Sequence, residues 1–430
     1  MYRSLGTLIL MGFGCGQPPS PREPDLGVGE VQATSGEFSH SSEWDSNFPA
    51  EADLAILLDT QDDPLIDFET RTEFGERLLP RMWLNSVKKA YTGTFAEDAI
   101  EDENIDEEWR LVSVRVSPCA PIGIRPDVDI DQWCWPTVRL VWQPVVQNFR
   151  LRWGVLTDFY ADDRAIHAIY PVAPRLSTGE HAGGAIRDTV ATYLSQDRPV
   201  EGMQNHIRNQ FDQARDSSAR AVLSALHSLR DPRLSSQSYQ DLNVRPETYQ
   251  SESIRTEFRD NLRWFLSQFA RPHDLDELTS FSLPEGRSPA ESDLWIFVGF
   301  DGNQGRPTLK ELNVIGRNSG NELVRIGASQ TVSVGVEDQT VEEEMERGND
   351  ELVDSVIVTS DDIETMGDAM ADPYQFLVPN TSCASCHRLN PLRFDFHSLS
   401  GFEDRGISIS PRVEMDVARD MVWSHTRLRR

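Results

Sequence analysis

Apolar and polar positions alternate in two segments of the first half of the chain. One segment runs from Leu111 to Val116 and the other from Val138 to Trp142. A period of two residues is typical of a strand that buries one face. The pattern therefore predicts two strands here, and a further strand near 166–172.

The apolar period changes to that of helices between residues 180 and 270. Apolar residues recur there at three- and four-residue steps, over 222–229 and again over 254–269. These stripes predict helices with one face in a core, and Asp231-Pro232 ends the first of them. A further helix is expected over 74–91, and strands are expected to return over 294–300, 311–315, 322–326 and 331–336. The whole pattern predicts an α+β fold.

Charge and length limit the classes of function. The chain has 430 residues, and 41 Lys and Arg against 70 Asp and Glu give a net charge of −29. This acidity argues against nucleic acid and against an anionic membrane surface as partners, because both are bound by clustered Lys and Arg. No apolar run approaches the roughly 20 residues of a membrane-spanning helix, so membrane attachment would need a terminus or a lipid.

The first cysteine ends an apolar N-terminal stretch. Residues 1–15 read MYRSLGTLILMGFGC, and Pro and Ser follow Cys15 closely. The stretch resembles a bacterial lipoprotein signal, in which the cysteine becomes the lipidated first residue of the mature chain, although Gly12 stands where such signals usually carry Leu. The resemblance implies export and lipidation at Cys15. The alternative is a buried or frayed N-terminal segment with an incidental thiol.

Two further cysteines flank a turn-rich segment between the first two predicted strands. Cys119 and Cys134 would lie near opposite ends of one connection. In an exported protein this placement favours a disulfide, with a closure-entropy contribution of about 3 kcal/mol. The alternative is two free buried thiols.

The last two cysteines belong to a C-x-x-C-H motif. Cys383 and Cys386 have the spacing that forms two thioethers with the vinyl groups of a haem, and His387 follows as the proximal iron ligand. Composition alone would give this pattern in roughly one chain in a thousand, so chance is a poor explanation. A zinc site would need a second pair of ligands at suitable spacing, and a thioredoxin-like pair would need a preceding strand.

This motif resembles that of c-type cytochromes and, more loosely, exported bacterial lipoproteins that end in a short haem-binding segment. The resemblance covers roughly the last 75 residues and rests on the one motif. It implies one covalently attached haem c and single-electron transfer outside the cytoplasm. Apolar residues around the motif would form the walls of the haem pocket.

The sixth iron ligand decides the chemistry of such a haem. Methionine would raise the reduction potential, histidine would lower it, and an open position would admit peroxide or a diatomic gas. His397 is the first candidate and Met415 the second; the other candidates are Met366, Met370, Met421 and His425.

Two acidic features have plainer interpretations. The loop from Glu97 to Glu108 holds eight Asp and Glu, and it could contact a basic redox partner or simply be solvated. Asp127, Asp129 and Asp131 have the spacing that begins a calcium loop, but the glycine and terminal glutamate of an EF-hand are missing. Common hydrolase and nucleotide-binding motifs are absent from the sequence.

We expect four regions. They are an export signal at 1–14, a flexible tether at 15–50, an α+β body at 51–345 and a small, mostly α-helical c-type haem segment at 346–430. Within the body we expect strands over 110–172, helices over 180–270 and strands over 294–336.

The expected function is electron transfer by a mono-haem lipoprotein on the periplasmic side of a bacterial membrane or at the cell surface. Its partner would be a redox protein of the envelope, with membrane contact only through the N-terminal lipid and with no nucleic acid. Two alternatives stay open: a haem peroxidase or haem-based sensor with an open distal site, and a binding or structural lipoprotein without haem.

Overall fold

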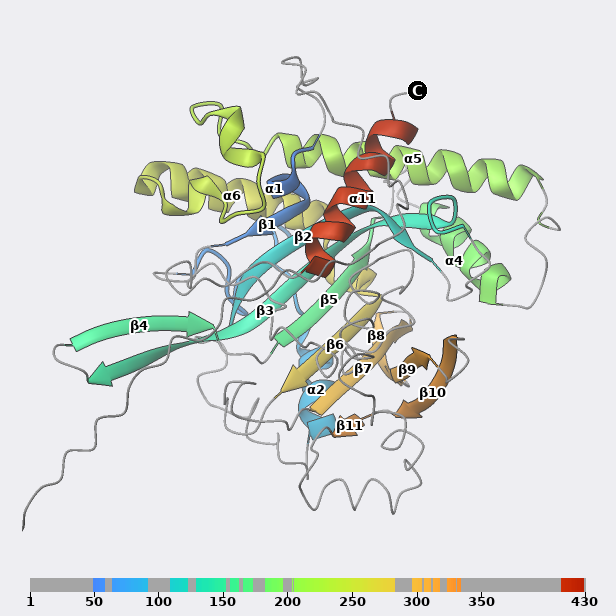
Figure 1. Ribbon diagram of the computed structural model, residues 1–430, viewed down its shortest axis with the longest axis horizontal. Helices are drawn as coiled ribbons and strands as arrows, with labels where there is room; N and C mark the ends of the chain where they lie inside the picture. The colour runs from blue at the N-terminus through green and yellow to red at the C-terminus, as the bar shows by residue number, and fades with distance from the viewer. Residues whose placement is uncertain are drawn as a thin grey trace, which may run out of the picture. The chain divides into compact units, whose positions relative to one another are not determined.

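The computed structural model confirms an α+β fold (Figure 1). The described residues are 49–58, 64–91, 109–122, 129–151, 155–161, 165–172, 182–195, 203, 205–282, 296–303, 305–310, 312–317, 323–329, 331–333 and 411–428.

An antiparallel sheet forms the centre of the body. Its main path runs through β1 (Ala55–Leu57), β2 (Trp109–Pro121), β3 (Cys134–Leu151), β5 (Ala165–Pro171), β6 (Glu277–Ser282), β7 (Ile296–Asn303) and β11 (Thr331–Ser333). Beside this path, β4 (Val155–Ala161) pairs with β3, and β8 (Arg306–Lys310) pairs with β7. A separate hairpin consists of β9 (Leu312–Arg317) and β10 (Leu323–Ser329).

Three described helices lie, in chain order, between two strands that pair with each other. The chain passes through α4 (Ala182–Ser195), α5 (Asn205–His227) and α6 (Glu252–Phe269) between β5 and β6, which pair with each other. Short 3-10 helices lie among them at Ser236–Tyr239, Pro246–Tyr249 and Pro272–Asp274. The described residues outside this stretch also form α1 (Glu51–Leu54), α2 (Arg81–Tyr91) and α11 (Pro411–Arg427).

The predicted apolar stripes form one core. In β3, the alternate residues Val138, Leu140 and Trp142 are fully buried, but Val141 and Gln143, at 3% and 0% exposed, show that the opposite face is covered as well. The stripes of α5 and α6 pack into the same core through residues such as Leu226 and Phe258. The sequence pattern therefore placed these faces correctly.

One helix starts later than the sequence predicted. The expected helix over 74–91 begins at Arg81, because residues 72–76 form a tight turn instead. The amide of Thr72 donates to the carbonyl of Glu76 at 2.7 Å, and Gly75 has a φ of 81°, which favours glycine. Pro80 then disfavours helical backbone at the residue before it.

The last helix joins the body although the sequence grouped it with the haem segment. Figure 1 shows α11 crossing β2, and α11 also contacts α1. Val413 and Val417 of α11 belong to the main core. The described end of the segment 346–430 is thus attached to the sheet.

Candidate functional site

The haem motif itself lies outside the described residues. Cys383, Cys386, His387 and His397 are all there, and so is Cys15. The described part of the expected haem segment, 346–430, is α11, which begins 24 residues after His387. This helix attaches the end of that segment to the body.

Three of the candidate sixth ligands lie on α11. Met415 is 39% exposed, whereas Met421 is partly buried and packs against the main core. His425 is half-buried and has interactions of its own. Of the two methionines on this helix, Met415 is therefore the one whose thioether is open to another group. Met366 and Met370 lie outside the described residues.

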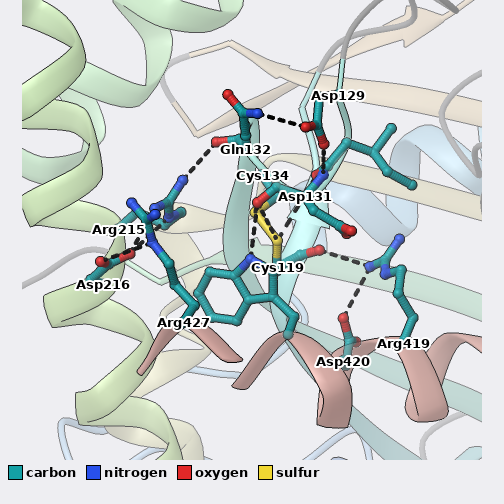
Figure 2. The surroundings of a disulfide bond; sticks show 12 residues. Cys119, Asp129, Asp131, Gln132, Cys134, Arg215, Asp216, Arg419, Asp420 and Arg427 are labelled. Carbon is teal, nitrogen blue, oxygen red and sulfur yellow. Dashed lines mark hydrogen bonds and ion pairs between the residues drawn. A yellow bond between two sulfur atoms is a disulfide. The ribbon is translucent and has the colours of Figure 1, made fainter. Parts of the chain in front are cut away.

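The expected disulfide is present where α11 meets the sheet (Figure 2). Ser117 pairs with Thr137 and Ala120 with Trp135, so Pro118 and Cys119 form a bulge opposite Pro136. The Cα of Cys119 lies 4.8 Å from the Cα of Cys134, which is the first residue of β3. This confirms the pairing that the cysteine spacing predicted.

The disulfide is buried under residues from two helices. Cys119, Cys134, Ala219 of α5 and Trp423 of α11 form a small apolar cluster, named here the disulfide cluster. Both cysteines are fully buried and Trp423 is 4% exposed. Trp423 therefore covers the disulfide from the α11 side.

Three carbonyl groups around the disulfide accept hydrogen bonds from the two helices. Arg419 Nη2 donates to the carbonyl of Cys119 at 2.7 Å, and Trp423 Nε1 donates to that of Asp131 at 2.9 Å. From α5, Arg215 Nη1 donates to the carbonyl of Gln132 at 2.6 Å. The end of β2 and the connection to β3 thus provide the acceptors for side chains far away in sequence.

Arg215 links α5 to α11. Its side chain is 1% exposed, and its guanidinium lies 5.7 Å from the ring centroid of Phe211 and 5.5 Å from that of Trp423. Asp216 accepts from it at 2.8 Å, and Arg427 of α11 lies 3.3 Å from the same carboxylate. Stacking and ion pairing together hold the cation in a buried position.

Two carboxylates of α11 face β2. Asp416 is 3.2 Å from Arg115 of β2, and Asp420 is 3.0 Å from Arg419 on its own helix. Asp420 is 3% exposed, and burial raises its pKa to about 6 although Arg419 opposes the shift. Asp420 can therefore take up a proton near neutral pH.

A second buried charge cluster lies at the start of the body. Asp53 of α1 binds Arg245 at 2.8 Å and Arg230 at 3.1 Å, and Glu247 lies 3.2 Å from Arg245. Burial opposes ionisation of Asp53, but the hydrogen bonds and charges of the two arginines outweigh it and lower its pKa. Since every charge here has a partner, the cluster fixes α1 to the body.

Metal binding finds no support in the described ranges. The Asp129 carboxylate accepts from the amide of Asp131 at 3.0 Å and from Gln132 Nε2 at 2.6 Å, while Asp127 lies outside these ranges. No group of three or more potential metal ligands occurs among the described residues. The helices in this part of the chain also include none that is long and apolar enough to cross a membrane.

Sequence reasoning missed how α11 is bound. Its buried positions, Val413, Val417, Asp420 and Ser424, recur at three- and four-residue steps and could have indicated an inward face. No pattern in the sequence points to Arg215 or to the carbonyl acceptors, because their partners are set by the fold.

Comparisons of the chain with protein-family models, curated proteins and solved structures give no significant match.

Proposed function

We propose that this chain is an exported, lipid-anchored, mono-haem c-type cytochrome-like protein that transfers single electrons at the bacterial cell envelope. The observation that carries the proposal is Cys383-x-x-Cys386-His387. Two thiols and an imidazole at this spacing are the donor set for covalent haem attachment.

The disulfide supports the compartment that this function requires. Disulfides persist in oxidising compartments such as the bacterial periplasm and are rare in the cytosol. Cys119 and Cys134 form one here, and haem attachment to cysteine also takes place outside the cytoplasm. With Cys15 as the lipidated residue, all five cysteines have a role in one exported protein.

Each residue of the site has a distinct task in this proposal. The thiols of Cys383 and Cys386 hold the macrocycle, and the imidazole of His387 binds the iron. His397 or, next, Met415 completes the coordination. Haem, when bound, supplies a one-electron couple whose potential depends on the sixth ligand and on burial. Asp416, through Arg115, helps to keep the end of the segment on the body.

The proposal also assigns the partners. An envelope redox protein would exchange electrons with the haem, and the membrane would be reached through the lipid on Cys15. The net charge of −29 favours a basic docking surface on that redox protein.

The visible spectrum and the intact mass test the proposal. The full chain, produced in a bacterium with haem-maturation machinery, should show c-type absorption and a mass increase of one haem. A Cys383→Ala/Cys386→Ala variant should be colourless while the Cys119–Cys134 disulfide still forms. A wild-type chain that is colourless, with no added mass, would contradict the proposal.

The same spectrum separates an electron carrier from the peroxidase or sensor alternative. A carrier should have six-coordinate, low-spin iron in both oxidation states and should not respond to peroxide or carbon monoxide. Rapid spectral changes with either ligand would instead favour an open distal site.

A further inference from the structure

Helix α11 is attached at the disulfide cluster through the groups that the disulfide holds in place. Arg419 Nη2 donates to the carbonyl of Cys119 (Figure 2). Trp423 Nε1 donates to the carbonyl of Asp131. The residues between Cys119 and Cys134 lie inside the ring that the disulfide closes. The covalent bond therefore restricts the positions of both acceptors relative to β2 and β3.

Losing these acceptors would be costly for a docked helix. Arg419 and Trp423 are 6% and 4% exposed, so water has little access to replace a lost partner. A buried donor left without its acceptor costs about 1–3 kcal/mol, and more when it is charged. Undocking restores hydration to both side chains, which makes it the easier response once the acceptors move.

Reduction would disturb the cluster directly. Two thiols need more room than two bonded sulfurs, and both cysteines are fully buried beneath Trp423. Close packing leaves little space for this expansion. Sγ of Cys134 also lies 3.5 Å from the carbonyl oxygen of Asp131, so the free thiol would be a second donor at the carbonyl that accepts from Trp423.

We propose that the Cys119–Cys134 disulfide is a redox-dependent lock for α11, which docks firmly on the body only when the disulfide has formed. The two thiols are oxidised by thiol–disulfide exchange with a disulfide-bearing oxidoreductase of the envelope. One thiolate attacks the donor disulfide and expels a thiolate, and the second then displaces the donor sulfur from the mixed disulfide. The two cysteines lose two electrons and two protons, and the donor becomes a dithiol.

The lock gives the body control over the segment that ends at α11. The proposal does not require haem, since it rests on contacts among 119–134, α5 and α11. If haem is bound, oxidation of one cysteine pair would also fasten the end of the haem segment to the sheet. In a reducing compartment the same helix would be released.

Hydrogen exchange of the full-length chain tests the lock. In Cys119→Ser/Cys134→Ser, and equally in Cys119→Ala/Cys134→Ala, the amides of α11 should exchange roughly tenfold faster or more than in the oxidised wild type. Peptides from β5 and β6 should keep their protection. Using two replacements separates loss of the bond from effects of a buried hydroxyl.

Two outcomes would overturn the proposal. If α11 is equally protected with and without the disulfide, the bond does not control docking. If β5 and β6 lose protection together with α11, the disulfide supports the whole body and is not a lock for one helix.

Thermodynamic linkage supplies a reciprocal test. If the disulfide favours docking, docking must favour the disulfide by the same factor. Trp423→Ala should therefore contain a larger fraction of reduced Cys119 and Cys134 than the wild type in a fixed glutathione buffer. Val422→Ala, which changes a half-exposed neighbour on the same helix, should match the wild type. Equal reduction of all three proteins would contradict the lock.

Discussion

Asp53 and Arg245 are 192 residues apart in the chain, yet their side chains are 2.8 Å apart and almost fully buried. Arg245 also lies 4.6 Å from the ring centroid of Tyr239, and Arg230 shares the same carboxylate. Charged residues are rarely this buried unless they are paired. Neither residue stands out in the sequence, since the partner of each is set by the fold.

Replacing Asp53 should be strongly destabilising. Asp53→Asn leaves the buried Arg245 and the partly buried Arg230 without their shared negative charge, so the free energy of unfolding should fall by about 3–5 kcal/mol. Glu257→Gln is the matched control, because Glu257 pairs with Arg233 at 2.8 Å on the surface and should contribute about 1 kcal/mol or less. Chemical denaturation measures both, and equal effects would refute the importance of burial.

Asp420 should give the stability a pH dependence near neutrality. Burial raises its pKa from 3.8 to about 6, so the folded state keeps a proton that the unfolded chain has released. Its stabilising contribution is present below about pH 4 and is lost as the pH rises through 6, by roughly 1–3 kcal/mol. Asp53, whose pKa is lowered, acts in the opposite direction and only at lower pH.

Denaturation curves from pH 4 to 7 check this dependence. The difference in unfolding free energy between wild type and Asp420→Asn should fall as the pH rises, since the amide does not titrate. Arg419 stays charged over this range, and Asp416 contributes a nearby negative charge in both proteins. A difference that does not change with pH would show that Asp420 has an ordinary pKa.

At the scale of elements, the apolar periodicity predicted most of the strands and helices that have a long, regular pattern. The strand expected at Val138–Trp142 is the buried centre of β3, and the stripe of 254–269 lies in α6. The stripe of 222–229 lies in α5 except for Leu229, because α5 ends at His227. The helix start at Arg81 was missed because a glycine turn and a proline overrode the apolar spacing. Short strands such as β1 and β8 have too few residues for a period to be recognised.

One close approach between β7 and the segment just before β6 should not tolerate a side chain. A Cβ at Gly302 of β7 would overlap the carbonyl oxygen of Leu275 and lie 3.0 Å from the Cα of Asp276. Because both neighbours are backbone, Gly302→Ala should lower the unfolding free energy by roughly 1–3 kcal/mol. Thr308→Ala, at an exposed position of the paired strand β8, should change it by less than about 0.5 kcal/mol. Thermal unfolding compares the two, and an unaffected Gly302→Ala would show that the segment at Leu275 and Asp276 can move away from β7.

At the scale of the molecule, segments far apart in sequence come together on the sheet. In chain order, the helices of 182–269 come between β5 and β6, although these two strands pair directly with each other. Helix α11, much later in the chain, packs across β2. Arg115 and Asp416, which pair at 3.2 Å, are 301 residues apart. Long-range ion pairs thus attach α1 to the rest of the body, and they also attach the end of the chain segment that carries the haem motif.

The proposed lipidation of Cys15 has a direct consequence for the whole protein. Wild type should be recovered with the membrane fraction and be released by detergent, because membrane attachment is assigned to the lipid. Cys15→Ala should prevent lipidation and thereby move the protein out of the detergent-released fraction, without changing absorption by haem. Equal recovery of both proteins from membranes would contradict the lipid anchor.

The sequence by itself determined the local chemistry of the protein. The C-x-x-C-H motif, the spacing of Cys119 and Cys134 and the apolar periods depend only on residues close together in the chain, so they can be read without a fold. The tertiary structure alone decided that Trp423 covers the disulfide and that Arg215 stacks on the ring of Trp423. It also decided that Arg419 donates to the carbonyl of Cys119. Those contacts join residues from three distant segments, and only burial in a shared core brings their donors and acceptors within reach of one another.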